Sequence, residues 1–193
     1  MELHEILHRI YQLPLDSIAK IEPYVKLFRH EKGHLLMQAN RLEKHVYLIK
    51  KGVVRAYSDS EKGEITFWFG EEGDAVLSMI SYVMNAPSYD NISLIESCEL
   101  YAIAISDLQK LYEKDIHLAN WGRKLAEIEL IKVEQRIISR ELLSATARYN
   151  LLMKQQPSLL RRVPLKFIAS YLGITQVSLS RIRGQSARSN MEK

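Results

Sequence analysis

One cysteine, Cys98, is present in the 193 residues of this sequence. A single cysteine excludes a disulfide within the chain and any zinc or iron–sulfur site that requires several thiolates. The sequence also lacks a run of about 18 apolar residues, which a membrane-spanning helix requires. Its first twenty residues lack the continuous apolar segment of a secretory signal. We therefore expect a cytoplasmic protein with no membrane association.

The residue patterns of catalytic sites are also missing. The sequence contains no glycine-rich phosphate loop, no nucleophile elbow and no pair of carboxylates set on a helical frame. Of its six histidines, His4 and His8 stand four residues apart, but they lie near a terminus, where surface packing is the expected role. We accordingly predict no catalytic residue, no metal site, no cofactor and no enzymatic activity.

Positive charge is concentrated at the C-terminal end. Residues 161–193 contain seven lysines or arginines and one acidic residue, a net charge of +6, whereas the whole chain carries +4 and residues 1–160 therefore sum to −2. A basic end on a nearly neutral body is common in nucleic-acid-binding proteins, because cationic side chains displace counterions condensed on phosphates. A basic tail can also serve only to solubilise a protein, and charge alone leaves both interpretations open.

Residues 25–105 have the pattern of short β-strands separated by turns. Apolar and β-branched residues gather at 45–52 and 64–70, and glycine-containing turns adjoin both runs. Strands of this length and spacing predict an antiparallel barrel or sandwich. Within this region, residues 75–85 are more typical of a short helix that ends before Pro87.

A long helix is predicted near residues 113–143, because residues 115–154 contain no proline and only one glycine. Apolar residues recur along it at spacings of three and four, and such a stripe needs a partner surface. The members of the stripe are Leu118, Trp121, Leu125, Ile128 and Ile131. The partner is either the chain's own β-domain or the same helix of a second copy. We favour a second copy, because the stripe is longer than the face that a small barrel covers, and we assign these residues to a dimer interface.

Two short helices separated by one glycine are predicted in the stretch FIASYLGITQVSLSRIR, residues 167–183. Gly173 is suited to a left-handed turn between them. The second helix buries Val177 or Leu179 together with Ile182, and its other side carries hydroxyl, amide and guanidinium groups. Such a helix–turn–helix typically places its second helix in the DNA major groove. A plain helical corner in a protein core has the same pattern and is the alternative.

Three segments together carry a resemblance to a known family. They are EKGHLLMQANRLEKHVYLIKKGVVRAY, FGEEGD at 69–74, and the C-terminal VPLKFIASYLGIT…SLSRIR. With the long helix between them, they occur in the order found in the CRP/FNR family of bacterial transcription regulators, the cyclic-AMP receptor protein and its relatives. The sequence resembles this family over nearly its whole length.

The resemblance implies an α+β fold in three parts. Residues 1–112 would form a jelly-roll (double-stranded β-helix) sensor domain of the cyclic-nucleotide-binding type, preceded by N-terminal helices. Residues 113–143 would form a dimerisation helix, and residues 144–193 a helix–turn–helix DNA-binding domain. The implied partners are a second copy of the chain and double-stranded DNA, and the resemblance leaves open RNA polymerase and a small-molecule effector as further partners.

The positions that contact DNA in this family carry over to the second helix of the pair. Thr175 stands at its hydroxyl N-cap, and Gln176, Val177 and Arg181 occupy base-contacting positions. Arg181 stands where most members keep an arginine that binds guanine, and Thr175 and Ser178 would bind phosphate. Val177 replaces the acidic residue of the best-known members, which leaves the preferred base sequence open. The complete set of expected DNA-binding residues is Thr175, Gln176, Val177, Ser178, Ser180, Arg181, Arg183 and Lys166.

The family's cyclic-nucleotide site does not carry over. Cyclic-nucleotide binders hold the phosphate with an arginine just before a serine or threonine, but residues 73–94 contain no arginine or lysine, and Ser88 stands at that arginine's position. The missing charge-assisted hydrogen bond is worth roughly 1.5–3 kcal/mol, so cyclic AMP is a disfavoured ligand. Two alternatives remain: a pocket for a neutral or apolar molecule, or a roll packed solid without a ligand. The residues expected to line such a pocket are Ser78, Tyr82, Ser88, Tyr89 and Asn91.

These features predict a homodimeric, sequence-specific DNA-binding transcription regulator controlled by an unidentified small molecule or by none. The alternative is a sensor or protein-interaction module of the same fold whose helical tail binds a protein rather than DNA.

Overall fold

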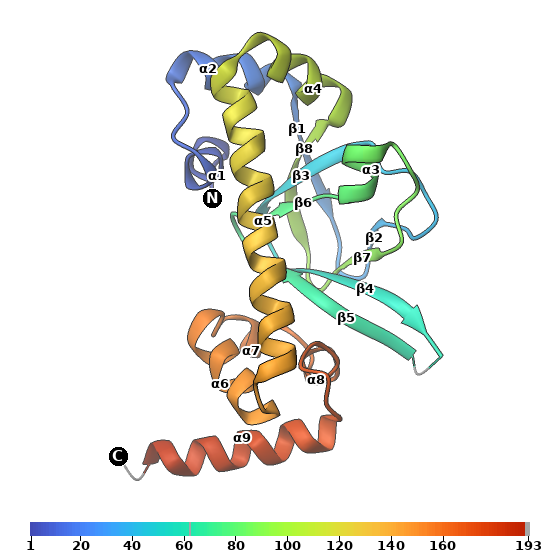
Figure 1. Ribbon diagram of the computed structural model, residues 1–193, viewed down its shortest axis with the longest axis vertical. Helices are drawn as coiled ribbons and strands as arrows, with labels where there is room; N and C mark the ends of the chain where they lie inside the picture. Colours follow the sequence, from blue (N-terminus) through green and yellow to red (C-terminus); the bar gives the residue numbers. More distant parts are fainter. Residues whose placement is uncertain (62, 192–193) are drawn as a thin grey trace.

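The computed structural model describes residues 1–61 and 63–191, with side chains described through residue 185. A β-rich lobe and a helical lobe are joined by one long helix that runs along both (Figure 1). The strands are β1 (Val25–His30), β2 (Leu35–Met37), β3 (His45–Lys51), β4 (Val54–Ser60), β5 (Gly63–Gly70), β6 (Ala75–Val76), β7 (Asn91–Leu94) and β8 (Cys98–Ala104). The helices are α1 (Leu3–Ile10), α2 (Leu15–Ile21), the 3₁₀ helix η1 (Glu22–Tyr24), α3 (Met79–Met84), α4 (Ile105–Lys114), α5 (Ile116–Leu142), α6 (Ala145–Gln155), α7 (Leu159–Arg162), α8 (Leu165–Tyr171) and α9 (Gln176–Met191).

The strands form two four-stranded sheets, ordered β1-β8-β3-β6 and β2-β7-β4-β5, and the neighbouring strands are antiparallel. An apolar core lies between the sheets, with Ile49 and Leu100 from the first and Val54 and Ile92 from the second. Gly52 makes the tight turn from β3 to β4 with φ +112°, and a Cβ there would lie 2.3 Å from Sγ of the buried Cys98. The predicted α+β fold with an antiparallel, jelly-roll-like domain is confirmed.

Residues 75–85, predicted as one helix, contain a strand and a shorter helix. Ala75 and Val76 form β6, which pairs with Leu48 and Tyr47 of β3. Both residues of β6 are buried, so they complete the edge of the first sheet instead of starting a helix. The helix α3 begins only after Ser78, whose side chain accepts a hydrogen bond from the Ser81 N–H.

The first half of α5 packs inside the β-rich lobe. Leu118, Trp121 and Leu125 are buried in one cluster with residues of α1, α2 and α4, and Ile128 is partly buried against the same cluster. Trp121 Nε1 donates a hydrogen bond of 3.1 Å to the Leu7 carbonyl of α1. The assignment of Leu118, Trp121 and Leu125 to a dimer interface is therefore wrong, while that of the partly buried Ile128 stays a prediction. The N-terminal helices extend the covering surface beyond the roll, and this allows the chain itself to bury the stripe. Only Ile131 of the predicted five is exposed.

The helical lobe shares an apolar cluster with the β-rich lobe. Val53, Phe69 and Ile95 of the roll lie in this cluster. Its members from the helical lobe are Tyr149, Leu152, Leu159, Val163, Ile168, Ala169, Leu172, Leu179 and Ile182. Because one core spans both lobes, the roll fixes where the C-terminal helices lie.

Replacing a buried residue of the apolar stripe on α5 should destabilise the fold. Leu118 is fully buried and Leu15 is 80% exposed, so the two leucines form a matched pair. We expect Leu118→Ala to lower the free energy of unfolding by about 2–5 kcal/mol, and Leu15→Ala to change it by less than about 0.5 kcal/mol. Urea unfolding measures both. The loss at Leu118 should be the same at low and high protein concentration; a loss that grows on dilution would instead place Leu118 between subunits.

Candidate nucleic-acid interface

The turn between α8 and α9 is built around Gly173. Gly173 has φ +66°, a left-handed conformation that costs glycine no steric energy. Its N–H donates to the Ser170 carbonyl, and the next N–H, from Ile174, donates to the Ala169 carbonyl, both at 3.0 Å. This pair of hydrogen bonds is a Schellman motif, which satisfies the last carbonyls of α8 and directs the chain across to α9.

The start and orientation of α9 follow from three side chains. Thr175 Oγ1 accepts a hydrogen bond of 3.1 Å from the Ser178 N–H, as an N-cap does. Leu179 and Ile182 are buried against α8 and its neighbours. Val177 is 71% exposed, so Leu179, not Val177, is the first buried residue of the helix.

The predicted DNA-binding side chains lie on the outward side of α9, except Lys166, which lies exposed on α8. Gln176, Ser180, Arg181 and Arg183 are exposed, and Ser178 is half-buried beside the N-cap. Within the described part of the chain, no carboxylate forms an ion pair with Arg181 or Arg183. The face therefore presents hydrogen-bond donors and uncompensated positive charge to solvent.

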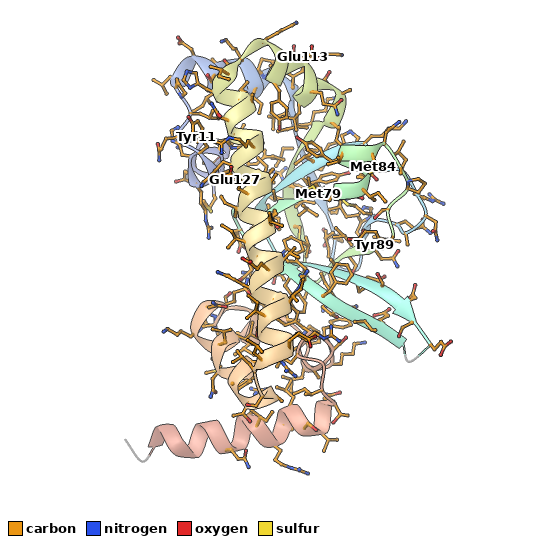
Figure 2. All side chains as sticks on the ribbon, in the orientation of Figure 1. Tyr11, Met79, Met84, Tyr89, Glu113 and Glu127 are labelled. Atoms are coloured by element: carbon orange, nitrogen blue, oxygen red, sulfur yellow. The ribbon has the colours of Figure 1, made fainter. Side chains whose placement is uncertain are left out.

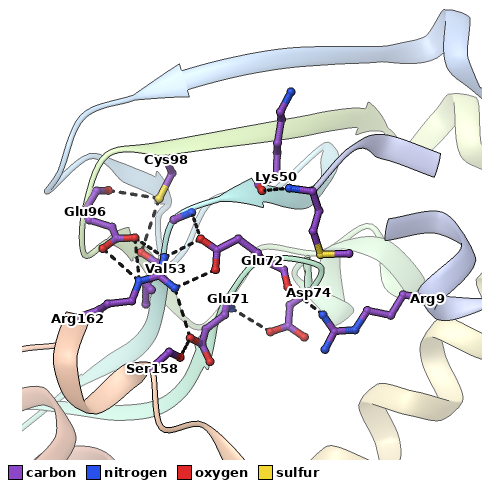
Figure 3. Close-up of polar contacts among 12 residues, drawn as sticks. Arg9, Lys50, Val53, Glu71, Glu72, Asp74, Glu96, Cys98, Ser158 and Arg162 are labelled. Atoms are coloured by element: carbon purple, nitrogen blue, oxygen red, sulfur yellow. Dashed lines mark hydrogen bonds and ion pairs between the residues drawn. The ribbon is translucent and has the colours of Figure 1, made fainter. Parts of the chain in front are cut away.

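Arg162 of α7 joins the helical lobe to two turns of the roll (Figure 3). Its Nη2 lies 2.7 Å from Glu72 Oε1 and also pairs with Glu96, while Nη1 lies 3.5 Å from Glu71 Oε1. Ser158 donates a further hydrogen bond to Glu71. One guanidinium is thus held by three carboxylates of the roll.

The charges in this cluster stabilise one another. Burial opposes ionisation of Glu72, but hydrogen bonds from Arg162 and from the Gly52 N–H outweigh it and hold the pKa of the Glu72 carboxyl at about 2. Hydrogen bonds to Glu72 and Glu96 raise the pKa of Arg162. Glu72 and Arg162 are therefore both ionised at neutral pH.

Helix α8 also covers the free edge of β5. β5 is the last strand of its sheet, so the outer N–H and C=O groups of its backbone need partners from elsewhere. Ser170 Oγ supplies two of them: it accepts a hydrogen bond of 2.9 Å from the Thr66 N–H and donates one of 3.0 Å to the Glu64 carbonyl. A single hydroxyl thus replaces two of the hydrogen bonds that a neighbouring strand would make with β5.

A buried arginine reinforces this contact. Arg55 of β4 donates from Nε to Thr66 Oγ1 at 2.8 Å and from Nη1 to Glu64 at 2.7 Å. Its guanidinium lies between the rings of Tyr57 and Phe167, 4.2 and 3.8 Å from their centroids. Because Phe167 belongs to α8, this stacking is a second cross-lobe contact. Nη2 of Arg55 has no partner among the described residues.

The residues predicted to line an effector pocket mostly form structural hydrogen bonds. Ser78 caps α3, Ser88 donates to Asp90, and Asn91 accepts from the Ala39 N–H at 2.9 Å. The Tyr82 hydroxyl donates to that of Tyr112 at 3.2 Å. These four residues line neither of the two cavities described below, and their assignment to a ligand pocket stays a prediction.

A cavity of about 260 Å³, here called the roll cavity, lies between the sheets and α5. Tyr89, which is labelled in Figure 2, is the one predicted pocket residue that lines it. Its cations come from α5: Lys132 lies 3.0 Å from Asp74 and 2.9 Å from Glu129, and Arg136 donates to the Phe67 carbonyl. Both cations lie outside residues 73–94, the segment that carries the phosphate-binding arginine in cyclic-nucleotide binders. Lys132 and Arg136 follow Ile128 of the apolar stripe on α5 by one and two further steps of four residues, and this spacing could have identified them.

Comparison with known proteins agrees with this architecture. Residues 27–115 match the model of the cyclic nucleotide-binding domain family. FixK2 from Bradyrhizobium japonicum superposes with a TM-score of 0.73 at 19% identity, over 86% of this chain and 86% of that one. The chain has the fold of the CRP/FNR regulators. A putative crp/fnr-family transcriptional regulator from Eubacterium rectale gives a TM-score of 0.70 at 19% identity over 88% and 82% of the two chains.

The c-di-GMP responsive regulator CLP from Xanthomonas campestris has the same CRP/FNR fold, with a TM-score of 0.71 at 13% identity over 92% and 93% of the two chains. No curated protein matches the sequence. Over the described residues, no helix has the length and apolar character of a membrane span, and no group of three or more His, Cys, Asp or Glu side chains is arranged to hold a metal ion.

The Glu72–Arg162 pair should make stability depend on acid pH. The folded-state pKa of Glu72, about 2, lies below its ordinary value of 4.5. The stabilisation is therefore complete above pH 4.5 and is lost as the pH falls toward 2. We expect Glu72→Gln to reduce the slope of unfolding free energy against pH in this window, as measured by urea unfolding at several pH values. Glu134→Gln, at an exposed site on α5, is the matched control; an equal change in both variants would contradict the assignment.

Proposed function

We propose that this chain is a homodimeric, sequence-specific DNA-binding transcription regulator and not an enzyme. One observation carries the proposal: α9 presents Gln176, Arg181 and Arg183 to solvent on a helix that a glycine turn and a buried face hold in place, and no carboxylate among the described residues pairs with either arginine. Arginine binds guanine bidentately in the major groove, and glutamine pairs with adenine. The CRP/FNR fold supports the same reading, since FixK2 and the Eubacterium rectale regulator share it.

Arg181 is assigned to reading one base in each half-site. Selection of bound sequences from a random DNA pool would define the operator, and a gel shift on that operator measures affinity. We expect Arg181→Ala to weaken operator binding by about 1–3 kcal/mol and to relax the base preference at one position per half-site. We also expect affinity to fall steeply with salt, because phosphate contacts release counterions.

The control for this experiment is Arg29→Ala, which removes the same charge from an exposed site on β1 of the other lobe. It should leave operator affinity nearly unchanged. Equal affinities for Arg181→Ala and the wild-type protein would reject the role of Arg181. Failure of the wild-type protein to retain any DNA at low salt would favour the alternative, a sensor or protein-interaction module without DNA binding.

The surface proposed for dimerisation is a partly exposed apolar stripe on the second half of α5, which also borders the two cavities. Ala126, Leu130, Val133 and Ile137 recur there at spacings of four, three and four, which is the spacing of a coiled-coil seam. Leu130 is 69% exposed and Ile137 is 57% exposed in the single chain. We call these four residues the dimer seam. Pairing through it would place two copies of α9 for successive turns of a DNA duplex.

A charge in the dimer seam should separate the subunits. Ile137→Glu would bury a carboxylate in each subunit, at a cost of about 3 kcal/mol or more per dimer, so we expect the dimer dissociation constant to rise roughly 100-fold. Sedimentation equilibrium measures this constant. Leu15→Glu, which puts the same group at an exposed site on α2, should leave it unchanged. A monomeric wild-type protein would refute the dimer.

The roll cavity is the proposed effector site, and cyclic AMP is not its ligand. Of the two cations that border it, Lys132 is already held in ion pairs by Asp74 and Glu129. A cyclic phosphate would have to displace these contacts, whereas a neutral molecule would not. The selection experiment, repeated with cell extract and with cyclic AMP alone, tests this: cyclic AMP should leave operator affinity unchanged.

A further inference from the structure

A second cavity, of about 710 Å³, lies where the β-rich lobe, α5 and the helical lobe meet. We call it the junction cavity. Residues 66–69 of β5 form one wall, the second half of α5 forms another, and α6 with the end of α8 closes the third side. Its volume falls in the range of roughly 300–1,000 Å³ that is typical of ligand sites. It shares a few residues with the roll cavity, and Ile137 of the dimer seam also lines it, but it opens toward the C-terminal helices.

The wall of the junction cavity is largely apolar. Phe67, Trp68 and Phe69 of β5 face aliphatic residues of α5 and α6, among them Ile138 and Leu151. A ligand that fills this space would bury an apolar body there, at roughly 25 cal/mol per Å² of apolar surface removed from water.

The charged residues of the junction cavity are unbalanced. Asp74 is its one acidic residue, and Lys132 neutralises it at 3.0 Å. Three arginines remain, and in the described residues none of them has a carboxylate partner: Arg136, Arg140 and Arg148.

Two of these arginines are fixed by carbonyl groups. Arg148 donates to the Leu172 carbonyl at 2.9 Å and to the Leu143 carbonyl at 2.6 Å, and Arg136 donates to the Phe67 carbonyl. A carbonyl orients a guanidinium but does not cancel its charge, so the cavity keeps a net positive charge beside an apolar wall. An anion that enters it gains charge partners without breaking an ion pair.

We propose that the junction cavity binds an amphipathic anion, with an acyl or aromatic body against the β5 wall and a carboxylate directed to Arg136 and Arg140. This is a second ligand site, separate from the roll cavity. The bound molecule touches the roll, α5 and the helical lobe at once, so it stabilises the arrangement in which all three are together. Any effect of the ligand on operator affinity rests on the proposed DNA-binding function, whereas binding of the ligand to the junction cavity does not.

Isothermal titration calorimetry of the full chain with decanoate, below its micelle concentration, tests the proposal. We expect saturable binding of one decanoate per chain, and no saturable binding of decyltrimethylammonium, which has the same apolar chain and the opposite charge. Arg140→Gln should weaken decanoate binding about fivefold, the upper range for one partly exposed charge pair. Arg123→Gln, the same change on α5 outside both cavities, should change it by less than about twofold.

Two further variants locate the site. Leu151 lines only the junction cavity and Met79 only the roll cavity. Leu151→Trp should abolish decanoate binding, while Met79→Trp should leave it unchanged, with circular dichroism confirming that both fold. Absence of decanoate binding overturns the proposal, and this is the result expected if a second copy of the chain fills the cavity. Equal binding of the cationic probe or equal effects of the two arginine variants also overturns it. So does loss of decanoate binding in Met79→Trp. Gel shifts without decanoate report on DNA binding separately.

Discussion

The apolar cluster shared by the two lobes is the contact on which the proposed DNA-binding surface depends. α9 carries that surface, and its buried residues Leu179 and Ile182 pack on α8, which in turn packs on Phe69 of β5. Lobes joined only by a flexible linker would leave α9 free to rotate about the end of α5. Here the orientation of α9 is set by the same strand that lines both cavities. A displacement of β5 would therefore move the recognition surface with it.

Polar contacts make this docking specific as well as stable. Apolar packing tolerates sliding, whereas the Ser170 hydroxyl fits only one position on the β5 edge, between the Thr66 N–H and the Glu64 carbonyl. Arg162 likewise fixes α7 at the three carboxylates of the roll. Undocking would leave Arg55 without its stacking partner Phe167, and the Thr66 N–H and Glu64 carbonyl of β5 without their hydrogen bonds to Ser170. Such a contact is either made completely or lost, which favours two discrete arrangements of the lobes over a continuum.

Local patterns were predictable from the sequence, and long-range ones were not. Gly173, the Thr175 cap and the exposed arginines of α9 depend on neighbours within a few residues, and these predictions agree with the structure. The stripe through Trp121 was identified correctly but given the wrong partner, because its strong apolar character reflects burial under α1, far away in sequence. Ser88 shows that a local contact can also escape the pattern, because Asp90, two residues away, accepts the hydrogen bond of its hydroxyl. A hydroxyl in an apolar segment more often satisfies its own neighbours than a ligand.

The three faces of α5 explain why so much of the molecule converges on one helix. One face, through Leu118 and Trp121, is fixed in the β-rich lobe; a second carries the dimer seam, which borders both cavities; and Arg136 and Arg140 line the junction cavity near the C-terminal end of α5. A helix is stiff over this length, so a displacement imposed on one face of α5 moves the side chains on its other faces. The fixed face resists movement of the first half. Any movement of α5 must therefore occur in its second half, which borders the cavities. This half is the part of α5 nearest α9.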